Sequence, residues 1–232
     1  MCGKFTAMAS WAEMVAIPQP PAIDENKVGE DREVAFRVMT NLPIILFDKS
    51  AGRRRVVPMR WGFPHPNDWR RPQPLHARSE TIDTTRAFAD AFRDGQRGIV
   101  LMRTFNEAPD VEGPTVQHTI APGDDGVLAA AFLWRRFAVP DQQQAQPQPM
   151  FACVMVTVPA NALLTTLPTD RMPAFIAPDD WALWLDEEPA SLEEVKACLK
   201  TVDGARWRMS REERAKAARR ARPTVSDPGG LF

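Results

Sequence analysis

The feature that most constrains the fold is a series of short apolar runs separated by turn-forming segments. The run at 150–158, "MFACVMVTV", is rich in β-branched residues, and comparable apolar runs occur at 97–102 and 126–139. β-Branched side chains pack well on a pleated surface and favour strands over helices. Gly, Pro and polar residues separate the runs. The pattern therefore predicts a sheet built from many short strands.

Other segments complete this prediction. We expect further strands within 32–48, 50–63 and 115–122, a loop over 64–77, and helices at 9–17, 81–95, 177–186 and 191–200. The last helix begins with a capping box, in which Ser191 and Glu194 exchange hydrogen bonds. Many strands with few helices predict one α+β domain, with an antiparallel, barrel-like β core and peripheral helices. We expect the domain to span 1–200 and a basic tail to span 201–232.

Composition narrows the possible partners. Hydrophobic residues make up 44% of the chain, enough to build a core without disulfides, and the formal net charge of −1 gives no overall attraction to nucleic acid. The three cysteines form no CxxC pair, so neither a zinc site nor a cofactor is expected. We find no secretion signal and no run of 18 apolar residues, and we expect a monomer in the cytoplasm.

The first residues, "MCGKF", carry the most reactive group of the sequence. Methionine aminopeptidases remove Met1 when the next side chain is small, so we expect the mature chain to begin at Cys2. That terminus would present an amine and a thiol on neighbouring carbons, and Gly3, which lacks a side chain, would leave room for a bulky reaction partner. Cys153 and Cys198 lie in apolar or helical contexts, and we expect both to be buried.

Six stretches occur in an order that resembles the SRAP family, the SOS response-associated peptidase domain of abasic-site processing proteins. They are "MCGKF", "RWGF" at 60–63, "HARSETI" at 76–82, "AFADAFRDGQRGIVL" at 87–101, "FNEA" at 105–108 and "TDRMPAFIAPDDWALWLD" at 169–186. The resemblance implies a single α+β domain with a groove for single-stranded DNA. It also implies covalent capture of abasic sites as a thiazolidine on the N-terminal cysteine, and self-processing that removes Met1.

The family's catalytic positions fall on four residues of this sequence. The resemblance makes Cys2 the nucleophile and Glu107 the catalytic acid, although the aromatic neighbours of that glutamate are absent. The asparagine of the family's Asn-Ala-Arg-x-Glu motif is replaced by His76. The histidine of its His-Asp-Arg-Met-Pro motif is replaced by Thr169, which cannot shuttle protons at neutral pH. The family's Asn-x-Ala-Pro stretch has no counterpart near residue 40.

These replacements set an expectation for the chemistry. A histidine can donate a hydrogen bond where the family has asparagine, and it can act as an acid or a base near neutral pH, so His76 is a candidate replacement for the missing histidine. We expect proton-dependent steps, such as reversal of the cross-link and strand cleavage by β-elimination, to be impaired.

Arginine and tryptophan side chains give the candidate contacts to single-stranded DNA. Arginine neutralises phosphates, and tryptophan offers a ring on which bases stack. The candidates are Trp61, Trp69, Arg70, Arg71, Arg78 and Arg171.

Two other functions stay open. A degenerate member of the same family would bind single-stranded DNA without covalent chemistry. An N-terminal-nucleophile amidohydrolase also begins Met-Cys-Gly, but its downstream Asn-Gly and Gly-Asp motifs are not apparent here.

Overall fold

The pairing of the two longest described strands closes a barrel. In the computed structural model, β11 (Leu128–Val139) and β12 (Gln148–Pro159) pair antiparallel from Phe132–Met155 to Val139–Gln148. The structure describes residues 4–6, 35–37, 39–108, 116–139 and 147–212. Cys2, the expected helix at 9–17 and the tail from 213 onward lie outside these residues.

Three more strands complete the barrel, in the order β11-β8-β3-β4-β12. They are β3 (Asn41–Asp48), β4 (Arg53–Trp61) and β8 (Arg97–Met102). Two short strands, β7 (His76–Arg78) and β13 (Arg171–Pro173), pair with β12 near the end of its contact with β11. The β12–β4 and β12–β7 pairs are parallel, so the barrel is mixed rather than purely antiparallel.

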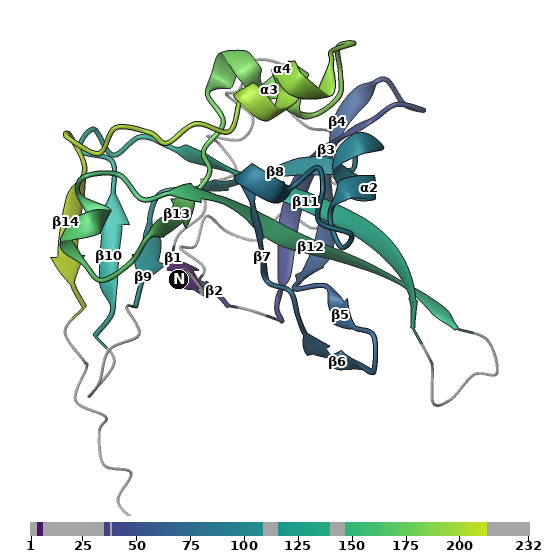
Figure 1. The fold of residues 1–232 in the computed structure, drawn as a ribbon, viewed down its shortest axis with the longest axis horizontal. Coiled ribbons are helices and arrows are strands. Elements are labelled where there is room, and N and C mark those ends of the chain that lie inside the picture. Colours follow the sequence, from purple (N-terminus) through teal and green to yellow (C-terminus); the bar gives the residue numbers. More distant parts are fainter. Residues whose placement is uncertain (1–3, 7–34, 38, 109–115, 140–146, 213–232) are drawn as a thin grey trace, which may run out of the picture.

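A second sheet lies beside the barrel, in the order β14-β10-β9-β1-β2 (Figure 1). Its strands are β1 (Lys4–Thr6), β2 (Ala35–Arg37), β9 (Phe105–Glu107), β10 (His118–Ala121) and β14 (Arg208–Arg211). β14 lies beyond the domain boundary predicted at residue 200, yet it pairs with β10 over four residues. A small hairpin of β5 (Pro64–His65) and β6 (Asp68–Pro72) projects from the barrel on the side away from α3 and α4 (Figure 1).

The helices are short, and α3 and α4 lie together above the barrel in the view of Figure 1. The described helices are η2 (Ser79–Thr81), α2 (Ala89–Arg93), η3 (Leu164–Thr166), η4 (Pro178–Asp180), α3 (Trp181–Trp184) and α4 (Leu192–Ala197). The Arg97 guanidinium, 2% exposed, donates to the carbonyl oxygens of Phe92 and Trp184 at 2.6 Å each, which joins α2 and α3 to β8. None of the helices in the described part of the chain is long and apolar enough to cross a membrane.

The α+β class with a barrel-like β core is confirmed, and so are the buried strands and the capping box of α4. Two local predictions are wrong. The segment 64–77, expected as a loop, contains β5, β6 and the start of β7. The helix expected over 81–95 is helical only from Ala89 to Arg93, because the preceding threonines form turns: Thr85 N donates to the Thr81 carbonyl at 2.8 Å.

Gly98 marks the closest approach of β8 to β3, and it supplies a test of the barrel packing. A Cβ there would lie 2.4 Å from Ile44 Cγ2 and 2.9 Å from the Ile45 carbonyl oxygen. We expect Gly98→Ala to lower the free energy of unfolding by about 1–3 kcal/mol in urea denaturation, because the backbone or Ile44 must shift. Gly52→Asn is the control, since Gly52 has φ +61° with open space around it, a conformation that asparagine tolerates. An equal loss in both variants would contradict the packing explanation.

Candidate functional site

Glu107 is a buried carboxylate in the second sheet. It ends β9, where all three residues are buried, and it is 1% exposed. Its position follows from strand alternation, because Phe105 and Glu107 point to the same face. Phe105 anchors that face to the core through rings of Phe175 and Trp207, with centroids 5.6 and 5.8 Å away.

The opposite face of β9 is fixed by a polar network. Asn106 Nδ2 donates to Thr119 Oγ1 at 2.9 Å and to Glu212 Oε1 at 2.5 Å, and Thr119 Oγ1 donates to the same carboxylate oxygen at 3.1 Å. These bonds tie β9 to β10 and to the residue that follows β14. The strand that holds Glu107 is therefore clamped on both faces.

The N-terminal strand runs next to Glu107. Lys4 in β1 pairs with Asn106, the residue before Glu107. Cys2 lies outside the described residues, but covalent geometry keeps its Cα within about 7 Å of the Lys4 Cα. The sheet register thus places β1, which begins at Lys4, directly beside the strand that carries Glu107.

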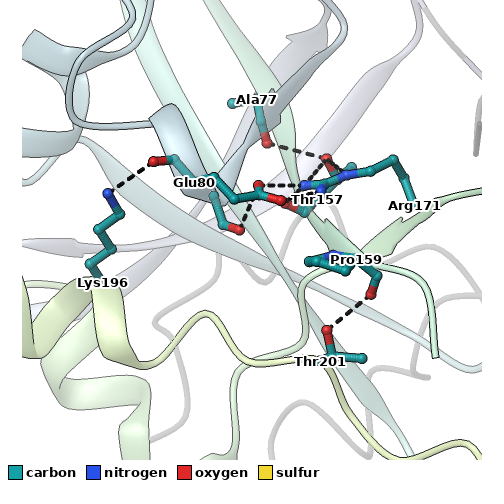
Figure 2. A network of polar contacts seen from close by, with 8 residues as sticks. Ala77, Glu80, Thr157, Pro159, Arg171, Lys196 and Thr201 are labelled. Carbon is teal, nitrogen blue, oxygen red and sulfur yellow. Dashed lines mark hydrogen bonds and ion pairs between the residues drawn. The ribbon is translucent and has the colours of Figure 1, made fainter.

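The two motif segments around residues 78 and 171 meet across β12. Thr157 pairs with Arg78 of β7 on one side and with Pro173 of β13 on the other. The buried Arg171 guanidinium crosses this strand (Figure 2). Its Nη1 and Nη2 donate to the two carboxylate oxygens of Glu80, and Nη2 also donates to the Thr157 carbonyl at 2.6 Å.

Arg171 is therefore a structural ion-pair partner of Glu80. It is 6% exposed, and its donors are directed at protein acceptors, so we do not include it among the proposed DNA contacts. The Arg171 guanidinium lowers the pKa of Glu80 to about 2, while partial burial acts in the opposite direction. Lys196 of α4 adds to the network by donating to the Glu80 carbonyl at 3.1 Å and to the Asp83 carboxylate at 2.8 Å.

His76 and Thr169, the two residues that differ from the family motifs, lie beside this network. His76 begins β7 beside Met155 of β12 and meets the Trp61 ring edge-on, with centroids 6.3 Å apart. Thr169 precedes β13, and its hydroxyl donates to the Arg171 carbonyl at 3.3 Å. His76 belongs to β7 and Thr169 lies two residues before β13, both in or next to the barrel sheet, whereas Glu107 belongs to the second sheet.

The residues predicted to contact DNA differ in how exposed their side chains are. Trp61 is fully buried and donates through Nε1 to the Leu75 carbonyl at 3.3 Å, so no ring face is open to a base. Arg78 is exposed beside β12. Trp69, Arg70 and Arg71 lie together on β6, where Trp69 is half-buried and the arginines are exposed.

Arg60 fixes this hairpin to the barrel. Its guanidinium donates to the carbonyls of Trp69 and Arg70 at 2.7 and 2.5 Å, and the Arg70 guanidinium lies 4.9 Å from the Trp69 ring centroid. The hairpin therefore presents an aromatic ring and two cations on a fixed support.

The other two cysteines are unsuited to nucleophilic chemistry. Cys153 and Cys198 are buried free thiols, and burial raises the pKa of both, that of Cys153 well above its ordinary value. Thiolates are the reactive form, so neither competes with a terminal thiol. Among the described residues, no group of three His, Cys, Asp or Glu side chains could hold a metal ion.

Sequence reasoning missed His118, Asn106, Thr119 and Glu212. The register of β9 and β10 places His118 directly opposite Glu107 and Thr119 opposite Asn106. The only signal in the sequence is the alternation of apolar and polar residues in two short strands, which does not fix their pairing.

The Glu80–Arg171 pair gives a pH-dependent prediction. Glu80 is about half exposed, with 49% of its side chain accessible, whereas Arg171 is buried. We expect Glu80→Gln to cost about 1–3 kcal/mol of unfolding free energy at pH 7, because a buried guanidinium loses its carboxylate. The pKa of Glu80 is lower in the folded state than its value near 4.5 in the unfolded state, so the ionised carboxylate stabilises the fold above about pH 4.5. This contribution to stability is lost as the pH falls through about 2.

Urea unfolding between pH 7 and pH 2.5 tests this. The difference between wild type and Glu80→Gln should narrow as the pH falls below about 4.5. Glu193→Gln, an exposed position on α4, is the control and should change stability by less than about 0.5 kcal/mol. A difference that stays constant with pH would show that Glu80 acts only by packing.

Comparison with known proteins identifies the family. None of the curated proteins matches the chain. A solved structure from Bacteroides thetaiotaomicron has 18% identity and a TM-score of 0.74, covering 92% of this chain and 93% of its own. A protein from Bordetella bronchiseptica has 18% identity and a TM-score of 0.72, covering 91% and 100%.

A phage-related protein from the same organism has 19% identity and a TM-score of 0.64, covering 91% and 94%. At this identity the solved structures show the fold alone. The model of the family "SOS response associated peptidase (SRAP)" matches residues 1–214, which include every described residue. The chain therefore belongs to the SRAP family.

Proposed function

We propose that the protein binds single-stranded DNA at abasic sites and captures them covalently through Cys2. The SRAP family is associated with the SOS response and thus with DNA damage. The observation that carries the proposal is the burial of Glu107 on β9, next to the strand that begins two residues after Cys2. This position supports a role for the Glu107 carboxyl group in chemistry at the terminal amine and thiol. The protein would act as a monomer at the nucleoid.

The terminal amine suits the first step. An abasic deoxyribose opens to an aldehyde, which a neutral amine attacks. An α-amine has a reference pKa near 7.7–8.0, so roughly a tenth is neutral at pH 7, against well under about 0.1% of a lysine amine. Loss of water gives an imine, and attack by the neighbouring sulfur closes the five-membered thiazolidine ring. This closure is intramolecular and gains from proximity.

Glu107 supplies the acid and base chemistry in this proposal. Formation of the imine requires a proton on the departing hydroxyl group and removal of protons from nitrogen. A buried carboxyl group next to the reacting amine can perform both transfers. Removal of Met1 must come first, because an acylated nitrogen cannot attack an aldehyde, and we propose that the Cys2 thiol takes part in this cleavage.

The hairpin of β5 and β6 is the proposed DNA contact. The Trp69 ring offers a stacking surface, and Arg70 and Arg71 offer phosphate contacts on a support anchored by Arg60. Arg78, exposed on β7 two residues from His76, extends the positive surface toward the motif residues.

A non-covalent single-strand binder is the second candidate, and Thr169 is the observation that favours it. Its hydroxyl donates to the Arg171 carbonyl and cannot carry a proton between substrate groups at neutral pH. In that case the hairpin would bind DNA while the terminus remained unreactive.

A covalent adduct assay tests the choice between these functions. We expect wild-type protein to form a denaturation-resistant adduct with single-stranded DNA that carries an abasic site, and Cys2→Ala to form none. Glu107→Gln should slow adduct formation by about 100-fold, because general acid–base catalysis is lost. Intact mass should show that Met1 is absent. Salt-sensitive binding without any adduct would support the second candidate and contradict the first.

The hairpin is tested by DNA binding. We expect Trp69→Ala to weaken binding of an undamaged single strand by about tenfold, because one stacked base is lost. The double variant Arg70→Gln/Arg71→Gln should reduce the slope of log affinity against log salt by about 1.4, that is, about 0.7 for each lost phosphate contact. Arg93→Gln on α2 removes an exposed charge elsewhere and should leave the slope unchanged. If Arg93→Gln reduced the salt slope as much as the double variant does, a DNA contact at the hairpin would be contradicted.

A further inference from the structure

A row of three ionisable residues crosses the sheet at Glu107. In the register of β9, β10 and β14, His118 pairs with Glu107 on one side and with Arg211 on the other. Directly opposed residues of an antiparallel pair project from the same face, with Cβ atoms about 4.5–5.5 Å apart. The His118 side chain therefore projects from the same face as Glu107 and Arg211, from the strand between theirs.

The register is independently supported by the opposite face. Asn106 and Thr119 are the next opposed pair, and their side chains hydrogen-bond at 2.9 Å. Because strand side chains alternate, the pair Glu107 and His118 must project from the other face. The neighbouring row on that face is apolar, formed by Phe105, Ile120 and Met209.

The two faces differ in how their polar groups are satisfied. Asn106, Thr119 and Glu212 hydrogen-bond to one another. In contrast, His118 Nδ1 is a buried nitrogen that has no hydrogen-bond partner in the part of the chain that the structure describes. Leaving such an atom unsatisfied costs about 1–3 kcal/mol, and most buried polar atoms are paired. A functional role would account for this cost.

We propose that His118 is the proton-exchange partner of Glu107, a positioning residue that takes over the work of the histidine replaced by Thr169. This inference rests on the proposed function. Glu107 is 1% exposed, whereas His118 is half-buried, so the imidazole can link the carboxyl group to water. Histidine can gain and lose a proton between about pH 5 and 8.

Every proton that moves during imine formation and ring closure has a donor and an acceptor. Glu107 gives a proton to the carbinolamine hydroxyl, the C–O bond breaks, water leaves, and the nitrogen lone pair forms the C=N bond. A proton then passes from the His118 imidazolium to the Glu107 carboxylate, and the imidazole takes a proton from water. Sulfur attack forms the C–S bond, and the thiol proton returns to water. One water is released overall, and nothing is oxidised or reduced.

His76 is placed less well for this role. It lies on β7 in the barrel, against the edge of the Trp61 ring, and it pairs with Met155 rather than with a residue of β9. The charged groups that face His118 from the strands on either side are Glu107 and Arg211.

The test is the pH profile of adduct formation on full-length protein, with single-stranded DNA carrying an abasic site. We expect His118→Gln to form adduct about tenfold more slowly than wild type near pH 6.5, with a profile flattened between about pH 5 and 8. We expect His118→Ala to regain rate when imidazole is added to the buffer. Should the Gln variant fail to fold, His118→Asn takes its place.

Thr119→Val is the matched control, because it disturbs the opposite face of the same strand. It should keep the shape of the wild-type pH profile and show no rescue by imidazole. This inference would be overturned if the wild type formed the adduct and His118→Gln formed it at the same rate with the same pH profile. That result would leave the proposed function intact. Absence of adduct from the wild type itself would overturn both.

Discussion

The pairing of β11 with β12 is the constraint on which the rest of the structure depends. It joins the two ends of the strand order β11-β8-β3-β4-β12 and so closes the barrel. A closed sheet has no free edge to pair with another chain, and its interior fills with side chains. Closure buries the side chains of β12 that face the interior, and every residue of β12 from 152 to 158 is buried. The outer face of the sheet still presents exposed side chains, such as Arg55 and Arg78.

β12 changes its strand partners along its length. β11 leaves β12 at Met155, and β13 takes over that edge from Thr157, while β7 replaces β4 on the other edge. Two motif segments about 90 residues apart thus flank a single residue, and Arg171 can reach Glu80 across it. Backbone pairing, rather than loop conformation, fixes their separation. The Glu80–Arg171 pair thus has a structural role that does not depend on the residues at positions 76 and 169.

The sequence predicted features that depend on local physics and missed those that depend on pairing. β-Branched runs and the Ser191–Glu194 capping box act locally, and the structure confirms them. The four prolines between 64 and 74 suggested a loop, yet the Arg60 guanidinium supplies the hydrogen bonds that hold β6 as a strand. Trp61 looked like a stacking residue, but the barrel encloses it. The place of Glu107 beside His118 depends on a register that neither short strand specifies alone.

The alternation of side chains lets the three residues of β9 serve two purposes. Asn106 points to one face and is locked by Thr119 and Glu212, so the strand cannot slide by one residue without breaking that network. A one-residue shift would also turn Glu107 away from His118, because every side chain would change face. The structural network thus holds Glu107 and His118 on the same face of the sheet. The proposed proton exchange between them depends on this register.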